Sequence, residues 1–267
     1  MNDELKFTVI SDTHYYSKKN FVDGFDKNKK PKPGQLFFSR SEEIVEHTFD
    51  CLCKNDTPDI VLISGDLTYN GERTSHDEMK AALKKLQQNG KRVYVITATH
   101  DYTTPRMPTY GIDKNDKYIE VESVKRTQLL KYYGDFGYNN AIAKHKSTMS
   151  YVAQLADGYR LFALNDDYGD PDCGFSDELM NWVKTEANNA KRDGQYIIAM
   201  THHPLVPPSP IYTAVAKGDM LNDYELRSKQ LSDLGFDFVL TGHTHMHNIS
   251  YCKIGNKKFY DISTAAL

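Results

Sequence analysis

Five short motifs in this sequence contain side chains of the kinds that bind divalent metal ions, and they follow one another along the chain. The motifs are Asp12-Thr13-His14, Gly65-Asp66, Ala98-Thr99-His100-Asp101, His202-His203-Pro204 and Gly242-His243-Thr244-His245. Carboxylate and imidazole ligands together suit ions such as Mn, Fe or Zn. None of the cysteines falls in a motif, which argues against a structural zinc site of the thiolate type.

Two of the motifs place ligands two residues apart. Along an extended chain alternate side chains point the same way, so we expect Asp12 and His14 to face one ion, and His243 and His245 likewise. With Asp66 and His202 the set is large enough for two ions roughly 3.5–4 Å apart, bridged by a carboxylate and a hydroxide. Such a hydroxide is a nucleophile at neutral pH, and the ions stabilise the charge that develops in an in-line displacement at phosphorus.

The motifs need a sheet that brings them to one edge, and each of them directly follows an apolar segment typical of a buried strand. These segments are residues 6–11, 59–64, 92–97, 195–201 and 236–241. Helices are predicted between them, at about 39–54, 75–89, 120–133, 176–194 and 222–234. The alternation of strands and helices predicts an α/β fold, in which ligands bind at the carboxyl edge of the sheet.

Local signals predict where some of these elements begin and turn. Ser39 with Glu42, and Ser75 with Glu78, have the spacing of a helix capping box. Two hairpins are expected, one at 148–155 and 159–165 around Asp157-Gly158, the other at 249–254 and 257–263 around Gly255-Asn256. They predict a second sheet region of mixed or antiparallel strands within a single domain over residues 1–267.

The composition is that of an ordinary globular protein, with 39% hydrophobic and 26% charged residues. The formal net charge of −3 argues against a stable nucleic-acid or membrane-surface complex. No apolar stretch approaches the roughly 20 residues that span a bilayer. The four cysteines form no CxxC pair, so we expect free thiols in a reducing compartment. With no signal peptide recognised, the expected location is the cytoplasm.

These motifs together resemble those of the calcineurin-like metallophosphoesterase superfamily, over residues 6–263. The stretch Ser64-Gly65-Asp66-Leu67-Thr68-Tyr69-Asn70-Gly71, with His202-His203-Pro204 and Thr241-Gly242-His243-Thr244-His245, is similar to bacterial phosphohydrolases like the class III cyclic-nucleotide phosphodiesterases. The resemblance implies a four-layer fold in which a two-sheet sandwich is flanked by helices. It also implies hydrolysis of a phosphodiester by in-line attack of a metal-bridging hydroxide.

The resemblance further implies a role for each motif residue. One metal ion would be held by Asp12, His14, Asp66 and His245, and the other by Asp66, His202 and His243. His100 would lie at the phosphate and steady or protonate the leaving oxygen, and Asp101 would orient His100. His203 is expected behind the ligands or at the surface. Because the ligand histidines must be neutral to bind metal, activity is expected to fall as the pH drops through roughly 6.5.

The third motif departs from the pattern of the superfamily, which has Gly-Asn at the positions of Ala98 and Thr99. The missing Asn normally supplies an amide oxygen to the second metal. Our hypothesis is that this metal is bound weakly, with water or Thr99 filling the gap. The alternative is a catalytically impaired metal-binding module of the same fold.

The sequence also narrows the substrate. Protein phosphatases of the superfamily carry arginines where this chain has Asn70 and Thr97, and the related DNA-repair nucleases need further DNA-contacting domains. A small phosphodiester, such as a nucleotide, is therefore favoured. Tyr15, Tyr16 and Tyr102 follow motifs directly and are candidates to stack on a base.

Residues 15–38 and 102–118 lack periodicity and follow motifs directly. They are either solvated loops or lids over the site. In the lid interpretation the first segment attracts an anionic substrate through Lys18, Lys19, Lys27, Lys29, Lys30 and Lys32. Related phosphoesterases continue beyond the strand at 257–263, so we also expect the chain to be a piece of a longer protein. The oligomeric state stays open.

Overall fold

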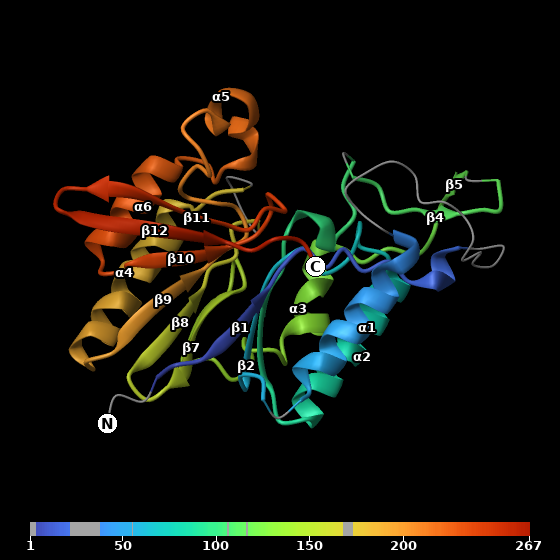
Figure 1. Cartoon of the computed structure of the whole chain (residues 1–267), viewed down its shortest axis with the longest axis horizontal. Helices are drawn as coiled ribbons and strands as arrows, with labels where there is room; N and C mark the ends of the chain where they lie inside the picture. Colours follow the sequence, from blue (N-terminus) through green and yellow to red (C-terminus); the bar gives the residue numbers. More distant parts are fainter. Residues whose placement is uncertain (1–3, 22–37, 55, 106, 116, 168–172) are drawn as a thin grey trace.

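A computed structural model describes residues 4–21, 38–54, 56–105, 107–115, 117–167 and 173–267 of the chain. Two sheets pack against each other, and helices lie on the outer side of each (Figure 1). The expected four-layer α/β sandwich is confirmed.

The smaller sheet contains three parallel strands in the order β1-β2-β3, namely Phe7–Ile10, Ile60–Ser64 and Arg92–Ile96. The central strand, β2, is buried along its whole length, as its uninterrupted apolar run predicts. Its outer side is covered by α1 (Ser41–Leu52), α2 (Arg73–Gln88) and the short α3 (Leu129–Tyr133) (Figure 1).

The larger sheet has the order β11-β12-β10-β9-β8-β7-β6. Its parallel centre consists of β8 (Tyr159–Ala163), β9 (Tyr196–Met200), β10 (Phe238–Thr241) and β12 (Lys257–Ser263). Antiparallel strands flank this centre: β6 (Ala143–His145) and β7 (Ser150–Ala156) on one side, β11 (Asn248–Ile254) on the other. The two predicted hairpins are β7–β8 and β11–β12. Helices α4 (Asp177–Arg192) and α6 (Tyr224–Asp233) cover this sheet, and α5 (Tyr212–Ala216) projects from its carboxyl end (Figure 1).

Alternate side chains of one strand serve two hydrophobic cores. In β8, Leu161 belongs to the core between the two sheets, whereas its neighbour Phe162 belongs to the core beneath α4 and α6. Both side chains are fully buried. Successive side chains of a strand point to opposite faces, so an apolar strand holds both layers together.

Two predicted capping boxes are wrong. Helix α1 follows Arg40 and α2 follows Glu72, neither with a side-chain cap. Ser39 lies in the 3₁₀ turn Phe38–Arg40 that precedes α1, and Ser75 Oγ accepts a tertiary hydrogen bond from the amide of Ser17 at 3.1 Å. The neighbouring Ser41, which the sequence did not single out, accepts through Oγ from the amide of Tyr16 at 2.9 Å. Both bonds tie the segment after the first motif to the helix layer.

The helix predicted at 120–133 is also too long. Residues 122–124 pair with the backbone after β2, where Arg73 donates to the Glu122 carbonyl at 2.9 Å and Val124 donates to the Gly71 carbonyl at 2.8 Å. Because this pairing uses their backbone groups, helical structure begins only at the 3₁₀ turn Arg126–Gln128. Of the two predicted insertions, residues 22–37, 106 and 116 lie outside the described part of the chain.

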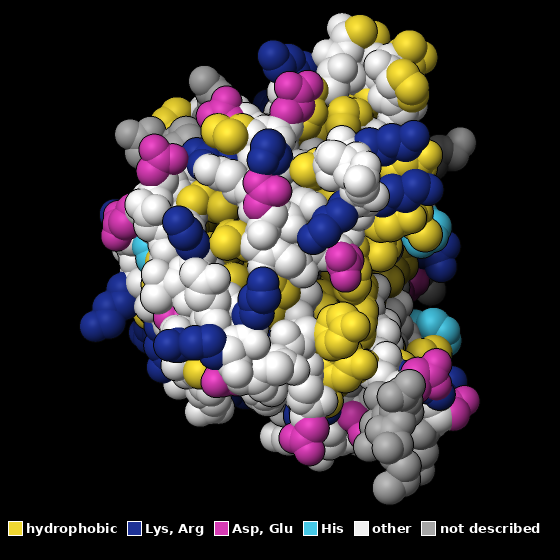
Figure 2. Space-filling view, turned by 90° about the vertical axis from the view of Figure 1, so that its left-hand side faces the viewer, with side chains coloured by type: hydrophobic (Ala, Val, Ile, Leu, Met, Phe, Trp, Pro, Cys, Tyr) yellow, Lys and Arg dark blue, Asp and Glu magenta, His cyan; other side chains and the backbone are white. Residues whose placement is uncertain are grey.

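The outer surface on the side of α4, α6 and β11 carries charges of both signs, interspersed, with hydrophobic side chains gathered in one band (Figure 2). Within the described residues, no helix combines the length and the apolar character needed to cross a bilayer. Near the end of the chain Ala266 pairs with Ser11, beside the first motif.

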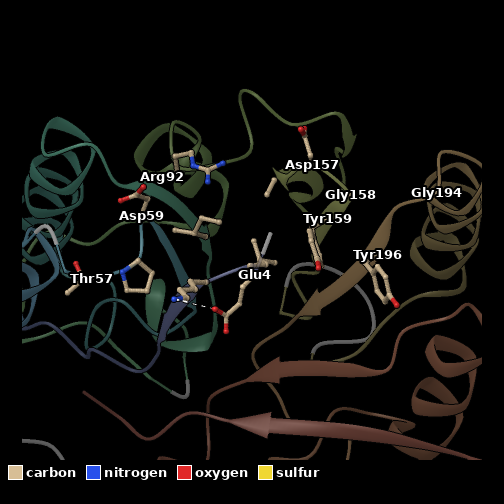
Figure 3. Close-up of a pocket in the computed structure, with 14 residues that line it drawn as sticks. Glu4, Thr57, Asp59, Arg92, Asp157, Gly158, Tyr159, Gly194 and Tyr196 are labelled. Carbon is tan, nitrogen blue, oxygen red and sulfur yellow. Dashed lines mark ion pairs between the residues drawn. The ribbon is translucent and has the colours of Figure 1, made fainter. Parts of the chain in front are cut away.

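A cavity of about 1040 Å³ opens at the amino ends of the strands (Figure 3). Its lining includes Asp59, Arg92, Asp157, Tyr159 and Tyr196. All five motifs lie at the opposite, carboxyl ends.

Candidate metal centre

The six predicted metal ligands converge at the carboxyl edge of the two sheets. They follow β1, β2, β9 and β10. Together with His100 they form three overlapping groups, and within each group the ligand atoms all lie within 4.8 Å of one another. The groups are Asp12-His14-His245, His14-Asp66-His100 and Asp66-His202-His243. Because His14 and Asp66 are each shared by two groups, the whole set forms one cluster.

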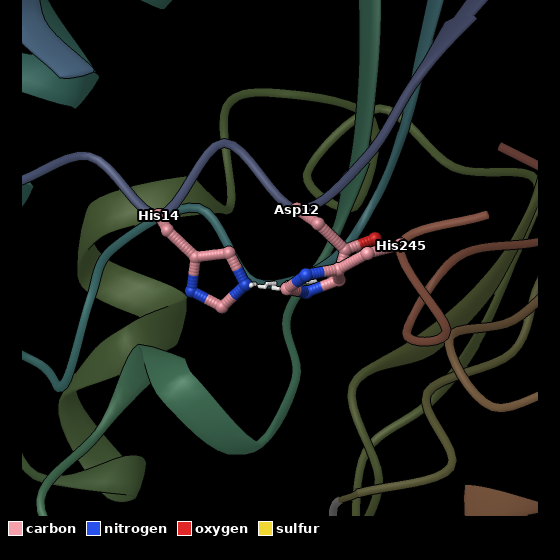
Figure 4. A group of neighbouring side chains, drawn as sticks. All are labelled: Asp12, His14 and His245. Atoms are coloured by element: carbon pink, nitrogen blue, oxygen red, sulfur yellow. Dashed lines mark hydrogen bonds and ion pairs between the residues drawn. The ribbon is translucent and has the colours of Figure 1, made fainter. Parts of the chain in front are cut away.

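The first group is drawn in Figure 4, where His14 and His245 point toward each other beside the carboxylate of Asp12. Their Nε2 atoms lie 3.0 Å apart, and Asp12 Oδ1 lies 3.8 Å from that of His14 and 3.5 Å from that of His245. Asp12 Oδ1 is buried and has no hydrogen-bond partner. A buried carboxylate oxygen in this state is what a metal ligand requires.

The third group, Asp66-His202-His243, contains two almost completely buried residues, Asp66 and His202. Asp66 Oδ2 lies 3.3 Å from His202 Nε2, and the same oxygen lies 3.8 Å from His14 Nε2 in the first group. His243 Nδ1 approaches His202 Nε2 to 3.3 Å. Asp66 therefore lies between the first and third groups, as a bridging carboxylate must.

The backbone that presents these ligands is not extended. Asp12, His14, Asp66, His243 and His245 all have positive φ, between 39° and 65°. The expectation that alternation along an extended chain aligns the paired ligands is therefore wrong, because tight left-handed turns do this instead. Such conformations are costly for residues other than glycine and concentrate at functional sites.

Two glycines make room for this packing. A Cβ on Gly65, whose φ is 103°, would lie 2.7 Å from the Ala98 Cβ and 2.8 Å from the His202 ring. A Cβ on Gly242 would lie 2.5 Å from Asp12 Oδ2. These glycines are needed because backbone and ligand side chains come into direct contact.

Hydrogen bonds fix how the ligands are presented. His202 Nδ1 lies 2.8 Å from the Ser64 carbonyl, which places its proton there and leaves Nε2 toward Asp66. The backbone amide of His243 donates to Asp12 Oδ2 at 3.0 Å, and that of His100 donates to Asp66 Oδ1 at 2.9 Å. Each carboxylate thus keeps its other oxygen for the cluster.

Burial and neighbouring charge act in opposite directions on the histidines. Burial lowers the pKa of His14 to about 4 and that of His243 well below its usual value. Burial also opposes protonation of His202, but the Asp66 and Asp12 carboxylates outweigh it and raise its pKa to about 10. In the metal-free protein one proton is therefore held at His202, and a divalent cation would replace it.

His100 lies beside the cluster, with its ring centroid 4.7 Å from that of His14. Its Nδ1 contacts the side-chain oxygen of Asn70 at 2.9 Å and the carbonyl of Tyr69 at 2.5 Å. Two acceptors at Nδ1 place a proton on that nitrogen and leave Nε2 for a substrate.

Asp101 does not orient His100, so the expected role is wrong. It is fully buried, and its two oxygens accept hydrogen bonds from the amides of Thr68 and Ala98, both at 2.9 Å. These bonds join the turns after β2 and β3. Thr99, half-buried, opens the 3₁₀ turn Thr99–Asp101 that carries His100.

The residue that holds the His100 ring is Asn70, which was not among the site residues predicted from the sequence. The backbone amide of Asn70 donates to Glu72 Oε1 at 3.0 Å. Burial raises the pKa of this carboxyl group to about 7. The sequence signal that could have pointed to Asn70 is its position only four residues after the ligand Asp66.

A buried pair lies behind the cluster: the sequence predicted one member there, His203, and missed the other, Asp166. Asp166 and His203 are both buried, with Oδ2 and Nδ1 3.3 Å apart, and Asp166 also accepts from the amide of His203 at 2.7 Å. The His203 ring lies 4.2 Å from that of the ligand His243. His203 therefore supports a ligand from behind. Asp166 could have been noticed because it follows a predicted strand at the same edge.

Other candidates near the motifs have structural roles. Tyr15, Tyr16 and Tyr102 are at most 8% exposed, so they offer no open ring face to a base. Lys18 and Lys19 pair with Glu42 and Glu78 at 3.3 and 2.8 Å. The remaining four lysines of the predicted lid lie outside the described residues.

The chemistry of the donors fits divalent cations. Two buried carboxylates and four imidazoles converge, and none of the groups with metal-ligand spacing in the described residues contains a cysteine. Mixed oxygen and nitrogen ligands of this kind suit Mn, Fe or Zn rather than a thiolate site.

Comparison with one solved structure gives the same fold. A dimetal phosphatase from Danio rerio aligns with a TM-score of 0.64 and 12% identity, over 97% of this chain and 87% of its own. A phosphopantetheinyl hydrolase from Mycobacterium tuberculosis aligns with a TM-score of 0.44 and 12% identity, over 100% and 91% of the two chains. A search of curated sequences gives no significant match.

The family profile described as calcineurin-like phosphoesterase matches residues 5–247, which include all the candidate ligands. This range runs from just before β1 to just beyond His245. The chain therefore belongs to the calcineurin-like phosphoesterase family, and its class of reaction is metal-dependent hydrolysis of a phosphoester.

Proposed function

We propose that the protein hydrolyses a small phosphodiester, such as a nucleotide, with two divalent ions in the cluster. The observation that carries this proposal is the position of His100, which touches the cluster and has Nδ1 fixed by Asn70. A diester has a leaving group that departs as an alkoxide or aryloxide, and a histidine so placed can protonate it.

The lack of arginine at positions 70 and 97 supports a diester over a monoester. A monoester dianion is commonly bound by bidentate guanidinium groups. At the two positions where protein phosphatases of the family carry arginine, Asn70 contacts His100 and the Thr97 hydroxyl accepts from Asn165 at 2.9 Å. Neither side chain adds positive charge, which suits the single charge of a diester.

The residues divide the work as follows. Asp12, His14, Asp66 and His245 would hold one ion, and Asp66, His202 and His243 the other. When bound, such ions activate water and neutralise the phosphate. His100, protonated at Nε2, gives its proton to the leaving oxygen as the bond from phosphorus to that oxygen breaks. Asn70 and the Tyr69 carbonyl keep the ring oriented through Nδ1.

A second candidate is a metal-binding module without turnover, and Thr99 is the residue that favours it. A threonine hydroxyl is a poorer ligand than the amide of Asn, so we propose that the second ion is bound more weakly than the first. The presence of His100 favours an enzyme, because a binding module has no use for a proton donor at this place.

We further propose that the protein acts in the cytoplasm on a free small molecule. The four cysteines are free thiols, which fits a reducing compartment. The interspersed charges of the face in Figure 2 do not form the basic surface that nucleic-acid binding uses.

The test is hydrolysis of bis(4-nitrophenyl) phosphate and of 4-nitrophenyl phosphate by metal-stripped protein titrated with Mn²⁺. We expect turnover of the diester that requires metal, exceeds that of the monoester and is lost in His100→Ala. Preference for the monoester would overturn the diester assignment. No turnover at saturating Mn²⁺, with the metal bound, would establish the module.

A further inference from the structure

A row of tyrosine rings leads from the metal centre to the surface. Tyr69 lies next to the cluster, with its ring centroid 6.0 Å from that of His100 and 6.4 Å from that of His14. Tyr110 follows at 5.9 Å from Tyr69, and Tyr118 at 4.1 Å from Tyr110. The outermost ring, Tyr118, is 57% exposed.

The row is held in place by the segment predicted as a lid. Tyr110 precedes β4 (Gly111–Ile112), which pairs with β5 (Tyr118–Ile119). The Tyr110 hydroxyl donates to that of Tyr69 at 3.1 Å, and the Tyr16 hydroxyl donates to the Tyr110 carbonyl at 3.0 Å. Tyr16 is fully buried and packs edge-on against Tyr69 at 5.9 Å. The rings are therefore oriented before a ligand arrives.

The row begins on the side of the site where the leaving group departs. The carbonyl of Tyr69 contacts His100 Nδ1, so the ring that begins the row and the proton donor are joined. Whatever is attached to the leaving oxygen must extend past His100, and the Tyr69 ring lies beside His100. Aromatic rings bind flat aromatic groups by stacking, regardless of base identity.

We propose that Tyr69, Tyr110 and Tyr118 form a subsite for an aromatic leaving group, such as a nucleoside, of the phosphodiester. This inference rests on the proposed function and gives it a substrate class. It predicts selectivity for aryl and nucleoside esters over alkyl esters such as glycerol diesters. Selectivity arises from stacking and not from hydrogen bonds to one base, so different bases are accepted alike.

The test compares Tyr69→Leu and Tyr118→Leu on an aryl and an alkyl diester, bis(4-nitrophenyl) phosphate and glycerophosphocholine. We expect kcat/KM for the aryl diester to fall between about 5-fold and 150-fold, mainly through KM, the range expected for loss of one stacking ring. The value for the alkyl diester should stay within about twofold in Tyr118→Leu, whose ring does not contact His100. Tyr69→Phe should retain the aryl preference. The matched control is Tyr196→Leu, an exposed tyrosine at the opposite end of the sheets.

A binding measurement separates this inference from the proposed function. Calorimetric titration of adenosine 5′-monophosphate and glycerol 3-phosphate into Mn²⁺-loaded protein needs no turnover. In Tyr69→Leu and Tyr118→Leu we expect weaker binding of adenosine 5′-monophosphate and unchanged binding of glycerol 3-phosphate, even if no diester is hydrolysed. Equal losses for both ligands, or unchanged nucleotide binding, would overturn the aromatic subsite and leave the diesterase proposal standing.

Discussion

The two ends of the sandwich differ in how they hold acidic side chains. At the amino end, the side chain of Asp59 is 78% exposed, in a cavity of about 1040 Å³. At the carboxyl end, Asp12 and Asp66 are at most 2% exposed at the side chain, each surrounded by imidazoles. All three groups with metal-ligand spacing among the described residues lie at the carboxyl end. The lesson is that convergence of buried charges, and not cavity size, locates the chemistry.

The backbone shows the same contrast. The carboxyl-end ligands occupy left-handed turns, a cost that the surrounding packing must sustain. At the amino end the left-handed positions, Gly158 and Gly194, are glycines, for which this conformation is no strain. Of the eight left-handed residues other than glycine in the described part of the chain, five belong to the metal centre, and the other three are Met149, Cys173 and Asp223.

The largest effect is expected from the carboxylate shared by both ligand groups. Asp66→Asn should lower activity by more than about 10⁴-fold and abolish tight Mn²⁺ binding, because water activation depends on the ions it bridges. Asp157→Asn is the matched control at the amino end, where Asn-Gly suits the hairpin turn as well as Asp-Gly does. Metal analysis and kinetics on both variants measure the difference. Equal effects of the two substitutions would remove the distinction between the ends.

The next effect separates proton transfer from metal binding. His100→Ala should lower kcat by about 10²–10⁴-fold, the usual contribution of a general acid, while Mn²⁺ affinity changes little. Calorimetric metal titration provides the control. A loss of metal equal to that in Asp66→Asn would make His100 a ligand instead of a proton donor.

Metal binding should depend on pH through His202. Its pKa of about 10 in the metal-free protein means that a proton must leave before Nε2 can bind an ion. Apparent Mn²⁺ affinity should therefore rise by up to about tenfold per pH unit between about pH 6.5 and 8.5, with proton release. His14, whose pKa is about 4, is already neutral in this range and adds nothing. Titration in two buffers of different ionisation enthalpy counts the protons. A pH-independent affinity would contradict the pairing of His202 with Asp66.

A smaller effect is expected from the residue that orients His100. Asn70→Ala should lower kcat by roughly 10–100-fold, as loss of a partner behind a functional histidine does, with KM and metal content preserved. Asn70→Asp should restore activity and move the alkaline limb of the pH–kcat profile upward, because a carboxylate holds the protonated ring more strongly. A profile unchanged in Asn70→Asp would reduce Asn70 to a loop brace.

The smallest effect concerns Thr99. Thr99→Asn supplies the amide oxygen that this chain lacks, so affinity for the second, more weakly bound ion should increase by up to about tenfold. This is the lower end of the effect that one substitution beside a metal has on metal affinity. Thr99→Val is the control, since it keeps the size and removes the hydroxyl. An identical Mn²⁺ titration in wild type and Thr99→Asn would show that this position does not face the ion.

Sequence was sufficient wherever a pattern is local and repeated. The continuous apolar runs predicted β1, β2, β3, β9 and β10 to within two residues at each end. This was possible because a strand buried on both faces of a sheet consists of apolar residues along nearly its whole length. Since each motif directly follows such a strand, their meeting at one edge was predictable too. The start of α4 after Ser176 was predictable as well, but the caps of α1 and α2 were not. Ser39 lies in a separate 3₁₀ turn, and Ser75 bonds to the distant Ser17 amide, whose position depends on the tertiary fold.

The inner geometry of the site could be predicted only in part. Asp12 and His14 were assigned to one ion from their spacing, but the left-handed turns that align them depend on packing against Gly65 and Gly242. Asp101 adjoins His100 in sequence and was taken as its partner. Asn70 holds that place because the turn after β2 lies against the turn after β3, a contact between segments 30 residues apart. An acid sensitivity near pH 6.5 was drawn from ordinary pKa values, which burial and ion pairing shift in opposite directions.

The most direct test of the metal centre is anomalous diffraction from crystals soaked in Mn²⁺ at two concentrations. Two peaks about 3.5–4 Å apart are expected at the carboxyl edge, one among Asp12, His14 and His245 and one among His202 and His243, with Asp66 between them. The second peak should fill only at the higher concentration. Peaks in the cavity at the amino end, or a single peak at the carboxyl edge at saturating Mn²⁺, would contradict the dinuclear site.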